Sequence, residues 1–144
     1  MNHHFKGEEL AATVKPIVPC KAGNLCEFYL DLLILWSAET CAPRMRGKWT
    51  ADNPTCGQCS ITAFLVQDYY GGEVFGVPLD DGNFHCYNVI DGKIFDLTNE
   101  QFGEKASSLV YDCAHPQSRA VHFGKQEKKE RYEALKLAFE DVRK

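Results

Sequence analysis

The sequence predicts an α+β fold in which helices pack on a small antiparallel sheet. Apolar residues recur every three or four positions in three segments, near residues 25–38, 60–70 and 132–142, and this is the period of a helix. Between the last two segments lie three short strand-like runs separated by Asp-Gly dipeptides, which are typical of hairpin turns. With 144 residues and 44% hydrophobic content, residues 1–144 are expected to form one domain that needs no disulfide scaffold.

An irregular lead-in and a helix are expected at the start of the chain. Residues 1–23 contain two prolines and no sustained hydrophobic period, which favours irregular structure. Over residues 25–38 the apolar positions have helical spacing, and Asn24 is a suitable N-cap. The first helix should therefore begin directly after Asn24.

A second helix is expected next. Residues 60–70 are mostly apolar, Cys59 lies at the first turn, and Gly71-Gly72 provides a stop.

An antiparallel meander should follow the second helix. Its two connections, Asp81-Gly82 and Asp91-Gly92, supply the positive φ angles of two-residue turns. The expected strands are residues 73–79, 83–90 and 93–98. A short strand or turn over residues 107–111 and a final amphipathic helix complete the prediction.

Composition excludes several classes of protein. The net charge is -4 and there is no basic, aromatic groove pattern, so we expect no nucleic-acid partner. The longest strongly apolar stretch, residues 28–36, is too short to cross a membrane, which needs roughly 20 residues. Seven cysteines, an odd number, without a signal sequence predict reduced thiols in a cytoplasm. No metal-binding or phosphate-binding motif is present, so we expect no cofactor.

Three residues in the order Cys59, His85 and Asp96 suggest nucleophilic catalysis by a thiol. A thiol at the first turn of a helix has its pKa lowered by unpaired amides and the helix dipole. If Asp91-Gly92 is a two-residue turn, paired positions on the hairpin sum to 183. His85 and Asp96 are then diagonal neighbours on one face, where the carboxylate can orient the imidazole.

The expected reaction is hydrolysis or acyl transfer at an amide or thioester bond, with a peptide, amide or thioester as substrate. The oxyanion that forms requires hydrogen-bond donors. The amide of Cys59 is the first candidate, and the side chains of Asn53 and Gln58 are the second. Gly57 should allow a substrate backbone to approach closely. Cys86 should face the core and matter little to the chemistry. Four further cysteines are expected to be small buried apolar groups, namely Cys20, Cys26, Cys41 and Cys113.

Several short motifs between residues 25 and 105 occur together in a known family. They are Trp36-Ser37 with Thr40, Trp49, Pro54, Gly57-Gln58-Cys59, Thr62-Ala63, Gln67-Asp68, Gly71-Gly72, His85 with Asn88, Asp96-Leu97-Thr98 and Gln101-Phe102. On these motifs the chain resembles the YunG-like family of small bacterial proteins. That resemblance implies a compact relative of the papain-like cysteine peptidases, with a nucleophile helix packed on an antiparallel sheet that carries the histidine. It implies a fold and a triad but no substrate.

Three other interpretations remain open. Cys56-Gly57-Gln58-Cys59 could be a dithiol redox pair in which Cys56 attacks. The same two cysteines could bind zinc with His85 and Cys86 or Cys113, although no second Cys-x-x-Cys motif is present. Finally, the chain could be a catalytically inactive papain-like binding or scaffold protein, in which these side chains only pack.

Overall fold

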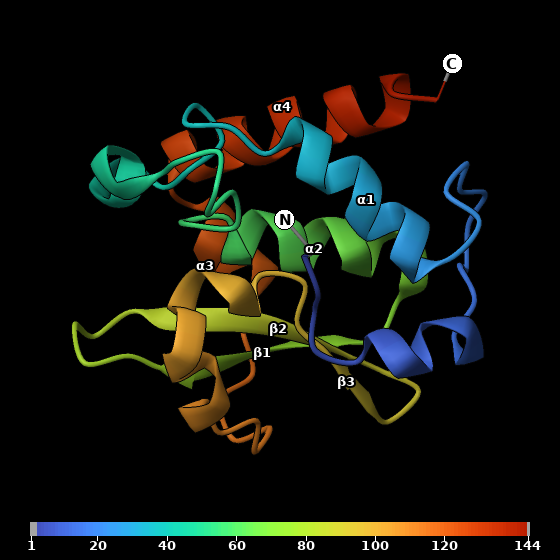
Figure 1. The fold of residues 1–144 in the computed structure, drawn as a ribbon, viewed down its shortest axis with the longest axis horizontal. Helices are drawn as coiled ribbons and strands as arrows, with labels where there is room; N and C mark the ends of the chain where they lie inside the picture. Colours follow the sequence, from blue (N-terminus) through green and yellow to red (C-terminus); the bar gives the residue numbers. More distant parts are fainter. Residues whose placement is uncertain (1–2, 144) are drawn as a thin grey trace.

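The computed structural model describes residues 3–143, and it shows an α+β fold. A three-stranded antiparallel sheet lies at one side, and helix α2 (Cys59–Tyr70) packs on it (Figure 1). Helix α4 (Gln126–Asp141) covers the opposite side of α2, and α1 (Leu25–Leu35) packs against α4. Helix α2 is thereby held between the sheet and a layer of helices.

Helix α1 begins where the sequence predicts. The side chain of Asn24 accepts a hydrogen bond of 2.9 Å from the amide of Glu27, which satisfies one donor of the first turn. The helix ends at Leu35, three residues earlier than expected. The side chains of Ser37 and Thr40 bond to each other's backbone amides, so a polar turn replaces the last helical turn.

The predicted second helix is confirmed. Helix α2 runs from Cys59 to Tyr70 and is capped by Gly71, whose φ of 72° is unfavourable for other residues. Eight of its residues are buried, since the sheet lies on one side and α4 on the other.

The sheet is built from β1 (Glu73–Pro78), β2 (Phe84–Ile90) and β3 (Lys93–Phe95), in that order. The second hairpin confirms the predicted register, because Ile90 pairs with Lys93 across a turn in which both central residues have positive φ.

The first hairpin differs from the prediction. The amide of Leu79 donates to the carbonyl of Asn83, which leaves a loop of three residues, 80–82, rather than two. Gly82 occupies its last position with a φ of 85°, the conformation that three-residue hairpin loops require there.

The lead-in is more ordered than its composition suggests. Lys6 exchanges two backbone hydrogen bonds with Asp96, of 3.1 and 3.0 Å, and so extends the sheet beyond β3. Residues Glu8–Thr13 form a 3-10 helix, and Phe5 and Val14 are buried in the core. The prediction of an irregular segment therefore missed its pairing with the sheet.

Four further short helices join the main elements, and none of them was predicted. They are η1 in the lead-in, η2 (Pro43–Lys48), η3 (Asn99–Ser108) and α3 (Arg119–Phe123). The predicted strand or turn over residues 107–111 is the end of η3 followed by a non-regular segment. The predicted final helix is confirmed as α4.

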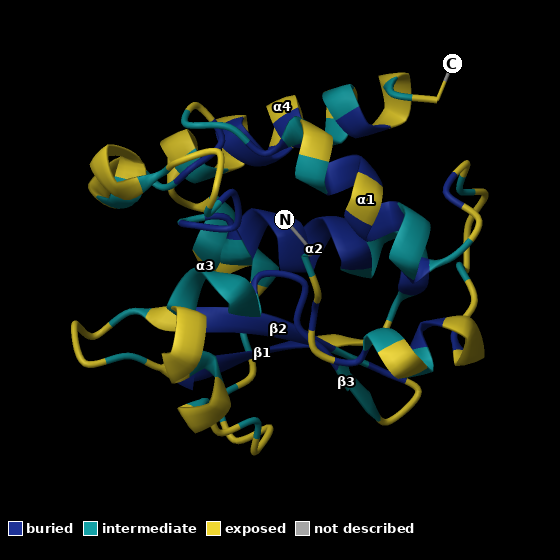
Figure 2. Ribbon diagram, viewed as in Figure 1, coloured by how far each residue is buried: buried dark blue, intermediate teal, exposed yellow. Residues whose placement is uncertain are grey.

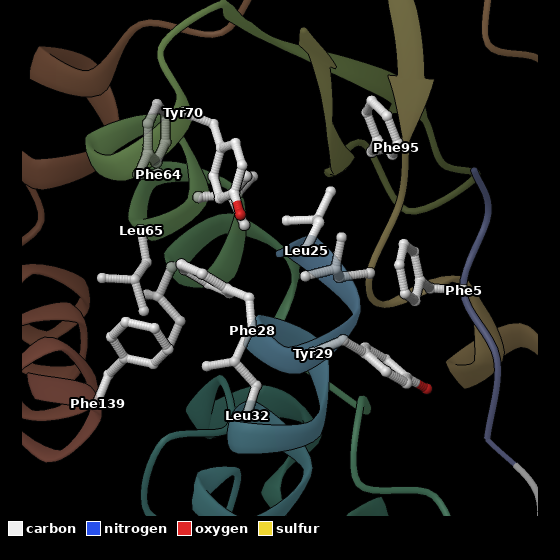
Figure 3. Close-up of a cluster of buried hydrophobic side chains, with 14 of the residues drawn as sticks. Phe5, Leu25, Phe28, Tyr29, Leu32, Phe64, Leu65, Tyr70, Phe95 and Phe139 are labelled. Carbon is white, nitrogen blue, oxygen red and sulfur yellow. The ribbon is translucent and has the colours of Figure 1, made fainter. Parts of the chain in front are cut away.

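The main core lies between α1, α2, α4 and the sheet (Figure 2). Phe28 is fully buried near its centre, beside Phe139 and Tyr70 (Figure 3). Among residues 3–143, no helix combines the length and apolar character needed to span a bilayer.

Candidate active site

Cys59 lies at the first residue of α2, facing the start of β2. Its thiol is 3.9 Å from the carbonyl oxygen of Phe84, and it contacts the side chains of His85 and Cys86. At this position the amides of the first helical turn have no partner within the helix. The packing of α2 on β2 thus brings the predicted nucleophile and the predicted base together.

His85 and Asp96 form a buried pair, as the hairpin register predicts. Nε2 of His85 donates to Oδ2 of Asp96 at 2.6 Å, and both side chains are completely buried. Because Nε2 is occupied by the carboxylate, Nδ1 is the nitrogen that remains for the thiol of Cys59. The ring packs edge-on against Phe102 at 4.8 Å between centroids, which further fixes its plane.

Asp96 is itself held from several sides. Its Oδ1 accepts from the amide of Thr98 at 3.1 Å, and its Oδ2 also accepts from the hydroxyl of Tyr111 at 2.7 Å. Tyr111 lies outside the hairpin and was not predicted to contribute. Burial, followed by the charge of Asp96, raises the pKa of Tyr111, so the phenol remains a donor.

The electrostatics favour a charged histidine. Burial opposes protonation of His85, but the charge of Asp96, the hydrogen bond to it and the contact with Cys59 together raise its pKa to about 10. A pKa of about 10 favours the imidazolium at neutral pH, with Asp96 as its buried counterion.

Cys59 is correspondingly acidic. The hydrogen bond with Cys86 is the largest cause that lowers its pKa well below the usual value, and the hydrogen bond and charge of His85 add to it against the opposing effect of burial. The same contact with Cys59 raises the pKa of Cys86. Cys86 is buried as expected, and its contact with Cys59 suggests a larger part in the chemistry than the sequence indicated.

We predict that Cys86→Ala slows alkylation of Cys59 at about pH 6 by roughly tenfold or more, because a hydrogen bond to a charged group contributes about 1.5–3 kcal/mol. Cys86→Ser retains a donor and should lose less. The measurement is the rate of iodoacetamide labelling at Cys59, mapped by mass spectrometry across pH. Equal rates for wild type and Cys86→Ala at this pH would show that Cys86 does not stabilise the thiolate.

A large cleft opens beside the thiol. Its volume is about 1190 Å³, and Cys59, His85 and Gln101 contribute to its wall. The loop of the first hairpin and the first part of α4 also contribute to the wall. Cys59, which is partly buried, thus lies in the wall of a cleft much larger than its side chain.

Gln101 is a site residue that the sequence reasoning missed. Its Nε2 donates to the carbonyl of Thr98 at 3.0 Å and lies 3.4 Å from Nδ1 of His85, while its Oε1 accepts from the amide of Gly57 at 3.4 Å. Gln101 thus connects His85 to the loop that precedes Cys59. The sequence contains one indication of this role, since Gln101 belongs to the Gln101-Phe102 motif that closely follows Asp96-Leu97-Thr98.

The two predicted side-chain donors for the oxyanion lie elsewhere. Gln58 is fully buried and its Nε2 donates to the carbonyl of Ser37 at 3.0 Å. Asn53 directs its Nδ2 toward the carbonyl of Gln101 at 3.5 Å. Neither belongs to the described residues that line the cleft. These amides support the loops around Cys59, and the backbone amide of Cys59 remains the first candidate for the oxyanion.

Cys56 does not have the properties of an attacking thiol. It is buried and contacts Cys41, and burial is the main cause that raises its pKa. Gly57 has a φ of 69°, and a Cβ there would lie 2.5 Å from the sulfur of Cys41. The glycine is therefore required by this internal packing.

The other cysteines follow the predictions only in part. Cys41 is buried, Cys20 and Cys26 are intermediate, and Cys113 is exposed, so the expected burial of Cys113 is wrong. Within residues 3–143, no group of three or more Cys, His, Asp or Glu residues is arranged to hold a metal ion.

Comparisons with known proteins identify the family of this chain. The sequence profile described as "YunG protein" matches residues 24–144. The chain is 39% identical over 92 residues to the "Uncharacterized protein YunG" of Bacillus subtilis (strain 168), a match that covers 64% of this chain and 75% of that protein. No solved structure matches the chain significantly. The chain thus belongs to the YunG family.

Proposed function

We propose that this protein is a thiol-dependent hydrolase or acyltransferase acting on an amide or thioester bond. The observation that carries the proposal is the buried His85–Asp96 pair in contact with Cys59 at the start of α2. A helix that bears the nucleophile and an antiparallel sheet that bears the histidine also support a relationship to papain-like cysteine peptidases.

The reaction follows from the charges in the site. The thiolate of Cys59 attacks the carbonyl carbon, and the resulting oxyanion accepts from the amide of Cys59. Collapse of this intermediate breaks the bond to the amine or thiol, and His85 donates its proton to the leaving group. Neutral His85 then takes a proton from water, or from an acceptor nucleophile, which attacks the acyl-enzyme and releases Cys59 as thiolate. Asp96 balances the charge of His85 in the steps where the ring is protonated.

The first expected result is selective alkylation of Cys59 at acidic pH. Since its pKa is lowered, the thiolate is populated as pH rises through that value, well before ordinary thiols with a pKa of about 8.5 react. Cleavage of an amide also needs protonated His85, so turnover should decline as pH rises through about 10. The rate of iodoacetamide labelling at Cys59, mapped by site, measures the rise at acidic pH. The rate of amide turnover measures the decline at about pH 10.

Two variants separate the competing interpretations. Cys59→Ala should abolish the fast labelling phase and the acyl-enzyme formed with 4-nitrophenyl acetate, whereas Cys56→Ser should retain both. Dependence on Cys56 instead would support a redox pair. Fast labelling without any acyl-enzyme would indicate a binding protein, and slow, uniform labelling of all thiols would refute the proposal.

A further inference from the structure

A lysine on α4 is oriented toward the cleft by a directed chain of hydrogen bonds. Nζ of Lys128 donates to Nδ1 of His122 at 2.9 Å, and Nε2 of His122 donates to Oε1 of Gln117 at 2.8 Å. The side-chain nitrogen Nε2 of Gln117 in turn donates to the carbonyl of His115 at 3.2 Å. Because that amide is anchored, its oxygen fixes the His122 tautomer whose Nδ1 accepts from the ammonium.

His122 serves here as a neutral acceptor. Burial and the nearby charge of Lys128 lower the pKa of His122 to about 4. Burial also lowers the pKa of Lys128, while the charge of Cys59 opposes that effect. The ammonium is therefore partly desolvated, held by a neutral partner, and close enough to Cys59 for their charges to interact.

The walls of the cleft carry an excess of positive charge, although the whole chain has a net charge of -4. Two ion pairs lie in the cleft wall, one between Arg44 and Asp81 and one between Arg131 and Glu127. Lys128 takes part in neither of them. The described basic residues of the cleft are Arg44, Lys48, Lys105, Lys125, Lys128 and Arg131, against the acidic residues Asp80, Asp81 and Glu127. A bound anion would thus meet a favourable potential.

We infer that Lys128 forms a subsite for a carboxylate beside the nucleophile, so that the preferred acyl substrate carries a carboxylate near the bond that is broken. This inference rests on the proposed function, and it names the substrate class for the same site. A single ammonium is a compact point charge that suits one carboxylate, and Lys125 adds to the local potential. His122 and Gln117 are positioning residues, since they act through the lysine.

Iodoacetate and iodoacetamide provide a matched pair of probes. With both reagents the thiolate forms a C–S bond and iodide leaves, and the reagents differ mainly in that one carries a carboxylate. The readout is the ratio of the iodoacetate rate to the iodoacetamide rate at Cys59, taken at a pH where the thiolate is fully formed. The exposed Cys113 of the same chain supplies the reference ratio.

In the wild type, the ratio at Cys59 should exceed that at Cys113. Lys128→Gln should lower the ratio at Cys59 by about three- to tenfold with a much smaller effect on the iodoacetamide rate, because a partly buried charge pair contributes more than an exposed one. Lys128→Arg should restore most of the preference. Lys129→Gln, at an exposed position of the same helix outside the cleft, should leave the ratio unchanged.

An unchanged ratio in Lys128→Gln would overturn the subsite, even if Cys59 remains a fast nucleophile. An equal fall in Lys129→Gln would overturn it as well, since the effect would then reflect overall charge. Failure of the proposed function has a different signature, namely that Cys59 reacts with iodoacetamide no faster than Cys113 at acidic pH. The two hypotheses can therefore fail independently.

Discussion

Replacing Asp96 with asparagine should slow the alkylation of Cys59 at about pH 6 by about a hundredfold or more. Without the carboxylate, burial is the main influence on His85 and its pKa falls, so the imidazolium that stabilises the thiolate is lost. Loss of this charge removes one of the causes that lower the pKa of Cys59 against the opposing effect of burial, so a much smaller share of the thiol is ionised at this pH. The measurement is the rate of iodoacetamide labelling at Cys59 as a function of pH.

Asp91→Asn is the matched control for this prediction. It makes the same chemical change in the same hairpin, at an exposed turn residue with a φ of 52°, and Asn-Gly favours that turn as Asp-Gly does. Its labelling profile should match the wild type. If Asp96→Asn also retained rapid labelling in acid, the His85–Asp96 pair would not be the source of the thiolate.

Phe28→Ala should lower the free energy of unfolding by about 3–5 kcal/mol, a large part of the roughly 5–15 kcal/mol typical of a domain. The ring of Phe28 is fully buried and packs 4.3 Å from that of Phe139, measured between centroids. Its loss leaves a cavity where α1 meets α4. Urea denaturation followed by circular dichroism gives the difference.

Ile34→Ala tests whether that loss is specific to the core. Ile34 lies on the same helix but is 75% exposed, so its truncation should change stability by less than about 0.5 kcal/mol. Similar unfolding midpoints for the two variants would contradict the packing described for α1.

The parts of the fold that could be predicted from the sequence are those governed by local chemistry. Asn24 caps α1, Gly71 ends α2, and Asp91-Gly92 sets the register that places His85 beside Asp96. Each depends on a few neighbouring residues whose conformational preferences are strong.

The missed features depend on contacts between distant segments. Gln101 reaches His85 and Gly57 from η3, and Tyr111 reaches Asp96 from the segment after it. Gln58 is turned inward by the carbonyl of Ser37, which lies 21 positions earlier in the chain. Hydrophobic period and turn residues carry no information about such pairings, so the oxyanion donors could not be chosen from sequence.

The pairing of Lys6 with Asp96 joins two segments that lie 90 positions apart in the chain. The backbone of Asp96 is clamped by a segment that precedes the region matched by the family profile, which starts at residue 24. Attachment of this N-terminal segment therefore supports the backbone position of Asp96. A change that detaches residues 3–14 from the edge of the sheet removes two backbone hydrogen bonds from Asp96, the residue whose carboxylate binds His85.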